Sequence, residues 1–174
     1  ADKRCDISFV PIKWVDGRAV TLCTLYDVTA LYDYQRKLEE QAVTDALTGL
    51  GNRTRFEKDL PGYVRDAVRA AEQGYLVYID LDDFKDINDS VGHSIGDDIL
   101  VAVSAALSHI GRGRADVYRL GGDEFAMLIP HQTIDATGII ESISRRFLRE
   151  FSLESGKYFC SATIAVARFP ADGT

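Results

Sequence analysis

Residues 116–129 read DVYRLGGDEFAMLI, and this stretch decides the fold. The segments DVYRL (116–120) and EFAMLI (124–129) are rich in apolar, β-branched and aromatic residues, which is typical of strands. Gly121 and Gly122 lie between them, and glycine tolerates the positive φ angles that a tight hairpin turn needs. The pattern therefore predicts a β-hairpin with a two-residue glycine turn.

A second apolar segment, upstream of this hairpin, predicts a central strand. YLVYIDL (75–81) follows Gly74 and ends in a run of acids. Alternating helices and strands, with a hairpin among them, predict an α/β (α+β) domain whose mixed central sheet is covered by helices. The remaining elements are predicted from apolar spacing: helices at about 53–71, 96–110 and 134–151, and a strand within 158–169.

The N-terminal part of the chain predicts separate elements. Residues Ile7 to Val28 alternate in a β fashion around Asp16-Gly17, which indicates another hairpin. Thr29 suits the N-cap of a helix over residues 30–43, where apolar residues recur at roughly helical spacing. We interpret this helix as a connector. Two arrangements stay open: pairing with a second copy, or packing on its own domain.

The bulk composition narrows the class of function. The chain has 174 residues and a formal net charge of −7, which argues against a broad nucleic-acid-binding surface because such surfaces need clustered cations. No apolar run approaches the roughly 20 residues that span a bilayer, so a cytoplasmic location is expected. Cys5, Cys23 and Cys160 lack the spacing of zinc or redox sites and are interpreted as buried small apolar residues in a reducing compartment.

Two acidic clusters stand where predicted strands end. One runs from Asp80 to Asp89, and the other is the GGDEF segment that ends at Phe125. Like charges brought together are costly unless a cation compensates them, and carboxylate oxygens suit Mg²⁺. The clusters thus indicate a metal–nucleotide site. From spacing alone the alternative stays open, because aspartates after a strand are more often turn formers or helix caps.

Three motifs resemble one known family in order and spacing. DALTGLGNR (45–53), IDLDDFKDINDSVGHSIGDDIL (79–100) and YRLGGDEFAML (118–128) are similar to motifs of the diguanylate cyclase (GGDEF) family. The resemblance covers about Thr44 to the C-terminus. It implies a palm-like fold, similar to nucleotide cyclase catalytic domains. It also implies an enzyme that condenses two GTP into cyclic di-GMP, with release of pyrophosphate, as a homodimer in bacterial signalling.

The resemblance further implies which groups are catalytic. Asp80 and Asp123 would ligate Mg²⁺ (or Mn²⁺), assisted by the backbone carbonyl of Leu81 and by Glu124. Asp123 would also be the base that helps to deprotonate the ribose 3′-hydroxyl of one GTP. Together with Glu124 it makes up the expected catalytic pair.

Other positions match the family's substrate contacts. Asn88 and Asp97 would hydrogen-bond the guanine edge, since an aspartate accepts from its N–H groups and an asparagine both donates and accepts. Phe84 and Lys85 match the phosphate-contacting segment. The double glycine would let the turn approach the nucleotide, where Cβ atoms have no room.

The sequence departs from the family pattern in two places. Many members carry an inhibitory product site, R-x-x-D; here Arg112 is in register, but Ala115 stands at the acid's position and Asp116 follows one residue later. A degenerate inhibitory site is expected, with Arg114 and Asp116 as remaining ligand candidates. The second departure is at the C-terminus, because the family continues with a helix and a strand, and that helix supplies a Lys and an Arg to the triphosphate.

Three segments are therefore predicted. Residues 1–29 resemble the C-terminal hairpin of a PAS-like sensor, 30–43 form the connector helix, and 44–174 form a GGDEF domain without its last helix and strand. The ending RFPADGT is similar to GGDEF domains that precede an EAL phosphodiesterase. The main hypothesis is an active cyclase. The alternative is a catalytically silent GTP-binding module that regulates such a neighbouring domain.

Overall fold

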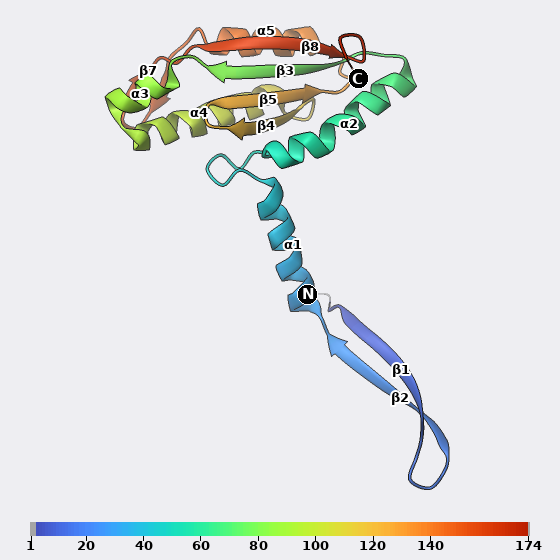
Figure 1. The fold of residues 1–174 in the computed structure, drawn as a ribbon. Coiled ribbons are helices and arrows are strands. Elements are labelled where there is room, and N and C mark those ends of the chain that lie inside the picture. Colours follow the sequence, from blue (N-terminus) through green and yellow to red (C-terminus); the bar gives the residue numbers. More distant parts are fainter. Residues whose placement is uncertain (1–2, 174) are drawn as a thin grey trace. The chain divides into compact units, whose positions relative to one another are not determined.

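The chain divides into two compact units, the first ending at Ala42 and the second beginning at Val43. The computed structural model describes residues 3–173, without the side chains of 35–41. Figure 1 shows the helices and strands of both units. Within the described residues, no helix is both long and apolar enough to cross a membrane.

The first unit consists of a hairpin and a helix. β1 (Cys5–Lys13) and β2 (Ala19–Asp27) pair antiparallel in unbroken register. α1 (Thr29–Val43) begins where Thr29 donates its backbone N–H to the Asp27 carboxylate at 3.1 Å. Large apolar side chains of the hairpin are exposed, among them Phe9 at 67% and Leu25 at 62%. The hairpin is therefore held by its strand pairing and not by a buried core.

The second unit is built on a four-stranded sheet of order β4-β5-β3-β8. Every neighbouring pair in it is antiparallel, so the mixed sheet expected from the sequence is corrected to an antiparallel one. The reason is that β3 lies between β5 and β8, and both run against it. Among the described residues, parallel pairing is confined to an isolated bridge between Gly51 and Tyr118. The strands are β3 (Gly74–Leu81), β4 (Asp116–Gly121), β5 (Glu124–Ile129) and β8 (Ala162–Phe169).

Helices cover both faces of this sheet (Figure 1). Successive side chains of a strand point to opposite faces. Val77 and Ile79 of β3 accordingly pack among buried residues of two helices, whereas Leu76 and Tyr78 lie in a separate cluster with a third helix. The first two helices are α4 (His93–Gly111) and α5 (Ala136–Arg146), and the third is α2 (Arg53–Ala70).

Three short elements are absent from the sequence prediction. α3 (Phe84–Val91) occupies most of the acidic run after β3, and α4 begins soon after it, at His93. The helix expected at 134–151 ends at Arg146, where the chain turns and places the guanidinium 3.6 Å from the centre of the buried Phe151 ring. A small hairpin follows, made of β6 (Phe151–Leu153) and β7 (Gly156–Tyr158).

Candidate active site

The pairing of β3 with β5 brings the two acidic clusters together at one end of the sheet. Asp80 stands directly opposite Glu124 in the register. One step further, the backbone N–H of Leu81 donates to the carbonyl of Asp123 at 3.3 Å. Directly opposed residues on antiparallel strands have Cβ atoms only about 5 Å apart. Acids that are remote in the sequence thus share one site, as the sequence predicted.

The carboxylate of Asp80 is in an unfavourable electrostatic environment. Burial raises its pKa above the usual range, and the negative charges of Asp123, Glu124 and Asp82 raise it further. Both effects disfavour the ionised form. A cation placed among these carboxylates would remove the repulsion, so this end of the sheet is suited to bind one.

Glu124 is held in place by two protein groups. The hydroxyl of Tyr78 donates to one of its oxygens, and the Arg53 guanidinium donates to the other at 3.1 Å. The hydrogen bond to Glu124, together with partial burial, raises the pKa of Tyr78 to about 12. Both oxygens of Glu124 therefore have protein partners in this structure, whereas Asp80 is repelled by the acidic side chains around it.

The donor set fits a hard divalent ion that shares its ligands with a substrate. In the described part of the chain, no three acidic, histidine or cysteine side chains are gathered closely enough to hold a metal ion by themselves. Mg²⁺ is usually held by one or two carboxylates together with phosphates and water. Asp80, Asp123 and the carbonyl of Leu81 satisfy that requirement.

The turn of the β4–β5 hairpin lies one residue later than predicted. Gly121 pairs with Glu124 inside the ladder, and the register shifts between Arg119 and Gly121. The turn residues are consequently Gly122 and Asp123, not Gly121 and Gly122. Gly121 has φ +148° and Gly122 has φ +52°, and an added Cβ atom would meet nothing within 4 Å at either position. Backbone conformation, rather than space within the protein, is what favours glycine here.

The guanidinium of Arg119 holds this turn in place. Arg119 donates to the carbonyl of Gly122 from two nitrogens, at 3.0 and 2.7 Å, and to the Asp45 carboxylate at 3.1 Å. Asp45 in turn accepts from the backbone N–H and the hydroxyl of Thr48. Burial opposes ionisation of Asp45, but the Thr48 hydrogen bonds and the charge of Arg119 hold its pKa below the usual range. The loop before α2 thus fixes the turn that carries Asp123.

The sequence does not predict the contacts of Arg119 with Asp45 and Gly122, or the partners of Glu124. Asp45 and Arg119 lie inside the motifs at 45–53 and 118–128, but the resemblance assigns no role to either residue. One local signal was available for Asp45, since an aspartate followed three residues later by a threonine is typical of a side chain that bonds its own turn. No local pattern indicates that Arg119 would reach it.

The predicted phosphate-contacting segment forms the start of α3. Asp83 has a left-handed backbone, with φ +53°, and it turns the chain from β3 into the helix. The Ile87 N–H donates to the Asp83 carbonyl, so the amides of Phe84 and Lys85 precede the first bond of the helix. Unpaired amides at a helix start are suited to bind phosphate. Phe84 itself is buried, whereas Lys85 is exposed.

The two predicted guanine contacts lie on adjoining helices. Asn88 belongs to α3, and Asp97 is exposed in the first turns of α4. Gly92 joins the helices with φ +89°, and its N–H donates to the Asn88 carbonyl at 2.9 Å. The Asn88 side chain lies against Gly96, the residue before Asp97. The bend therefore brings both polar side chains to one corner of the domain.

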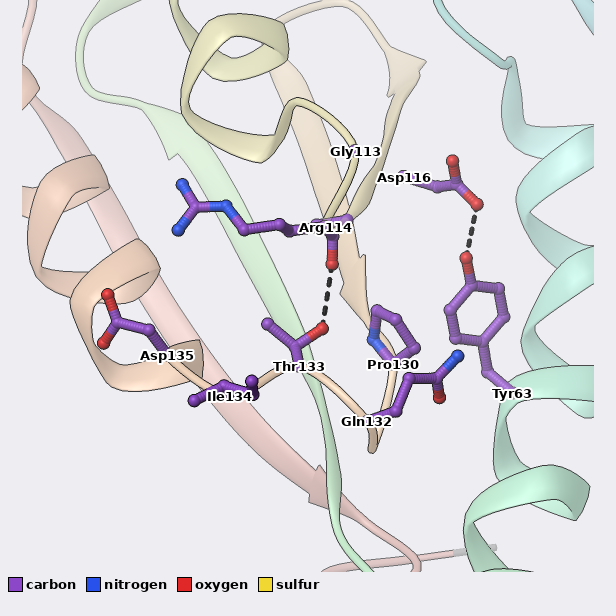
Figure 2. Close-up of a pocket in the computed structure, with 10 residues that line it drawn as sticks. Tyr63, Gly113, Arg114, Asp116, Pro130, Gln132, Thr133, Ile134 and Asp135 are labelled. Carbon is purple, nitrogen blue, oxygen red and sulfur yellow. Dashed lines mark hydrogen bonds between the residues drawn. The ribbon is translucent and has the colours of Figure 1, made fainter.

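The remnants of the expected inhibitory site do not converge. The guanidinium of Arg114 donates to the Ile110 carbonyl at 2.9 Å, while the Asp116 carboxylate accepts from the Tyr63 hydroxyl. Figure 2 shows their side chains pointing in opposite directions at the edge of a pocket of about 550 Å³. Arg112 is exposed and follows the last residue of α4.

Comparison with known proteins places the second unit in a family. The profile of the family described as "Diguanylate cyclase, GGDEF domain" matches residues 42–174. The curated relative TpbB, a diguanylate cyclase of Pseudomonas aeruginosa, is 38% identical over 143 residues, covering 80% of this chain and 33% of its own length. The probable diguanylate cyclase DgcE of Escherichia coli is 36% identical over 143 residues, covering 79% of this chain and 13% of its own length. The chain thus spans less than two thirds of these relatives.

Solved structures show the same architecture. The GGDEF domain of TpbB superposes with a TM-score of 0.68 at 37% identity, covering 75% of this chain and 78% of that one. The coiled coil and GGDEF domain of DgcB from Caulobacter crescentus, in complex with c-di-GMP, superposes with a TM-score of 0.72 at 25% identity, covering 81% and 76%. These matches confirm the α+β palm-like fold class. The architecture of the second unit, with the β4–β5 hairpin and the helices around it, agrees with the profile match. The chain belongs to the diguanylate cyclase GGDEF domain family.

Proposed function

We propose that this chain is the catalytic domain of a diguanylate cyclase, which condenses two GTP molecules into cyclic di-GMP and releases pyrophosphate. One observation supports this best: Asp80, Asp123 and Glu124 meet at the end of the sheet, and the pKa of Asp80 is raised by burial and by its acidic neighbours. Such a site needs a cation and, through it, phosphate. The names of the relatives point to the same chemistry.

Asp80, Asp123 and the Leu81 carbonyl would hold Mg²⁺ or Mn²⁺. When bound, the ion would neutralise phosphate charge and make the ribose 3′-hydroxyl more acidic. Glu124, fixed by Arg53 and Tyr78, adds negative charge beside the ion and could join it if one of its hydrogen bonds opened.

Asp123 is proposed as the base of the reaction. It takes the proton of the 3′-hydroxyl of one GTP, and the freed oxygen forms a bond to the α-phosphorus of the other GTP. The bond from that phosphorus to the bridging oxygen breaks, and pyrophosphate leaves with the electron pair. A second, equivalent step closes the ring. Because each domain is proposed to bind one GTP, the active form is a homodimer.

The α3–α4 corner is proposed to bind the base. Asn88 and Asp97 would hydrogen-bond guanine, and the amides of Phe84 and Lys85 with the Lys85 ammonium would contact the phosphates. Adenine lacks the N1–H and the 2-amino group from which Asp97 can accept. A preference for GTP over ATP follows.

The wider context of the chain is also a proposal. The first unit is proposed as the end of a PAS-like sensor, and the protein as a cytoplasmic signalling protein. A following EAL phosphodiesterase domain would parallel MucR of Pseudomonas aeruginosa, whose name is bifunctional diguanylate cyclase/cyclic di-GMP phosphodiesterase. Since Arg114 and Asp116 point apart, we propose that product does not inhibit through this pair.

Incubation of the chain with GTP and Mg²⁺ tests the proposal. Cyclic di-GMP and pyrophosphate should form, and the rate per protein molecule should rise with protein concentration because the reaction needs two copies. The Asp123→Asn variant should lose at least about 10³-fold in rate while keeping its melting temperature, because the base and a metal ligand are both removed. GTP binding without product would instead indicate a silent nucleotide-binding module. Measurable turnover in Asp123→Asn would contradict the role given to Asp123.

A further inference from the structure

Gly96 occupies a position where any side chain would collide with a proposed substrate contact. It is buried in the first turns of α4, facing α3. A Cβ atom built on it would lie 1.9 Å from Oδ1 of Asn88, 3.0 Å from its Cγ and 3.5 Å from its Nδ2. The carboxamide of Asn88 therefore occupies the space that a side chain at Gly96 would need.

The backbone of α4 gives no other reason for a glycine at this position. Gly96 has ordinary helical geometry rather than a left-handed conformation, and its N–H donates to the Gly92 carbonyl at 3.1 Å. Inside a helix, alanine is favoured over glycine because glycine loses more backbone freedom on folding. A glycine at Gly96 thus weakens the helix locally, and the space that it leaves is filled by the end of one polar side chain.

We propose that Gly96 is a positioning residue that fixes the carboxamide of Asn88 for guanine recognition. The inference rests on the proposed function, because it requires that Asn88 contacts the base. A carboxamide has a donor edge and an acceptor edge, and a base edge with fixed donors and acceptors matches only one orientation. The space left at Gly96 by the missing side chain holds the end of the Asn88 side chain and so fixes the position of the carboxamide. The same helix turn carries Asp97, so one glycine sets the spacing of both contacts.

The collision involves the far end of a flexible side chain, and this decides what a substitution would do. In Gly96→Ala, the Asn88 side chain can rotate away without moving the backbone of either helix. The stability of the fold is then preserved, or increased by the better helix former. The position of the carboxamide is lost, so the change should appear in nucleotide affinity.

The chain offers a matched control in Gly62. This glycine also lies inside a helix, α2, and its nearest neighbour to an added Cβ is a guanidinium nitrogen of Arg65 at 3.8 Å. Gly62→Ala therefore introduces the same methyl group into a helix without a collision. Both variants share the gain in helix propensity, and they differ only in the contact with Asn88.

Binding of GTP to the wild type, Gly96→Ala, Gly62→Ala, Asn88→Ala and the double variant Gly96→Ala/Asn88→Ala tests the proposal. Calorimetry should show the Kd for GTP raised about tenfold in Gly96→Ala, the size expected for one lost hydrogen bond, and unchanged in Gly62→Ala. The melting temperatures of Gly96→Ala and Gly62→Ala should equal or exceed that of the wild type, and Gly62→Ala should keep the wild-type kcat. In the Asn88→Ala background, Gly96→Ala should have no further effect on the Kd.

Other outcomes would contradict the positioning role or the proposed function. An unchanged Kd in Gly96→Ala would overturn the positioning role. A loss of the same size with and without the Asn88 side chain would show that Gly96 serves the fold and not the carboxamide, as would a melting temperature that falls in both backgrounds. Failure of the wild type to bind GTP would instead overturn the proposed function, and a loss confined to Gly96→Ala could not be mistaken for that.

Discussion

The β1–β2 and β4–β5 hairpins share antiparallel pairing but have very different surroundings. β1–β2 and β4–β5 are both antiparallel ladders closed by a turn that contains a glycine with positive φ. In the first, Phe9 and Leu25 are mostly exposed; in the second, five consecutive residues from Phe125 to Ile129 are fully buried. Strand pairing alone therefore does not define a site. The β4–β5 hairpin differs by its packing on both faces and by the contacts of its turn with distant parts of the chain.

The arginines beside the two turns also differ in their exposure and in their partners. In the first hairpin, Arg18 forms an exposed ion pair with Asp16, two residues away. In the second, Arg119 has a side chain that is only 11% exposed, and it joins Asp45 to the Gly122 carbonyl. A local ion pair in water contributes little, whereas a largely buried one cannot lose a partner without leaving a charge unpaired. The second arginine should matter for both folding and catalysis.

Exchanging each arginine for alanine gives the largest expected contrast. Arg119→Ala should lower the free energy of unfolding by about 2–4 kcal/mol, because Asp45 is left without its partner, and should reduce turnover by loosening the Asp123 turn. Arg18→Ala should change neither within error. Denaturant titration and the rate of cyclic di-GMP formation measure the two effects. Equal losses in both variants would refute the contrast between the hairpins.

The pH dependence of the unfolding free energy tests the charge repulsion at the acidic end of the sheet. Above its pKa, Asp80 carries a charge that opposes folding, since that pKa is higher in the folded than in the unfolded chain. Stability contributed by the protonated form is lost as pH rises through the raised folded pKa. Asp80→Asn should therefore raise the unfolding free energy at pH 7, by at most about 1 kcal/mol. The gain should vanish below the unfolded pKa of about 4.

The same variant should lose its response to Mg²⁺. Binding to the folded state raises the melting temperature of the wild type, and removing a ligand removes that shift. Asp98→Asn, in the exposed part of α4, is the control and should respond as the wild type does. A Mg²⁺ shift that survives in Asp80→Asn would place the ion elsewhere.

The glycines of the two turns give the smallest expected effect on stability. Gly17 has φ +86° and Gly122 has φ +52°, and neither has an atom within 4 Å of a built Cβ. Alanine at either position should cost about 1 kcal/mol from backbone strain alone. Thermal unfolding should show similar losses, while only Gly122→Ala should slow cyclic di-GMP formation. A loss of activity in Gly17→Ala of the same size would show that the effect is one of stability.

The sequence predicts those parts of the fold that depend on local patterns. The strand expected at 75–81 is found at 74–81, and the hairpin at 116–129 is found with its acids at the predicted end. A register shift of one residue is not visible in apolar alternation, so the sequence predicts the turn at Gly121 and Gly122 instead of Gly122 and Asp123. The sequence does not predict α3, because half of its eight residues carry capping and turn-forming side chains, which favour loops when read alone.

The candidate site was predicted from motifs and not from contacts. The pairing of Asp80 with Glu124 depends on which strands become neighbours, and local spacing does not contain that information. The contacts of Arg119 with Asp45 and of Arg53 with Glu124 span more than 70 positions of the chain. The fit of Asn88 against Gly96 depends on the angle between two helices. Each of these features comes from tertiary packing.

The distribution of thiols has a practical consequence. Cys160 is 1% exposed, and burial, with the charges of Asp82 and Asp123, raises its pKa to about 11, so it remains a protonated, shielded thiol at neutral pH. Cys5 and Cys23, expected to be buried, are instead exposed, because the β1–β2 hairpin that carries them has no buried core. A maleimide dye should therefore label the β1–β2 hairpin and leave the second unit unmodified. The native chain thus carries its own attachment points for a fluorescent reporter of how the first unit responds when the second one binds nucleotide.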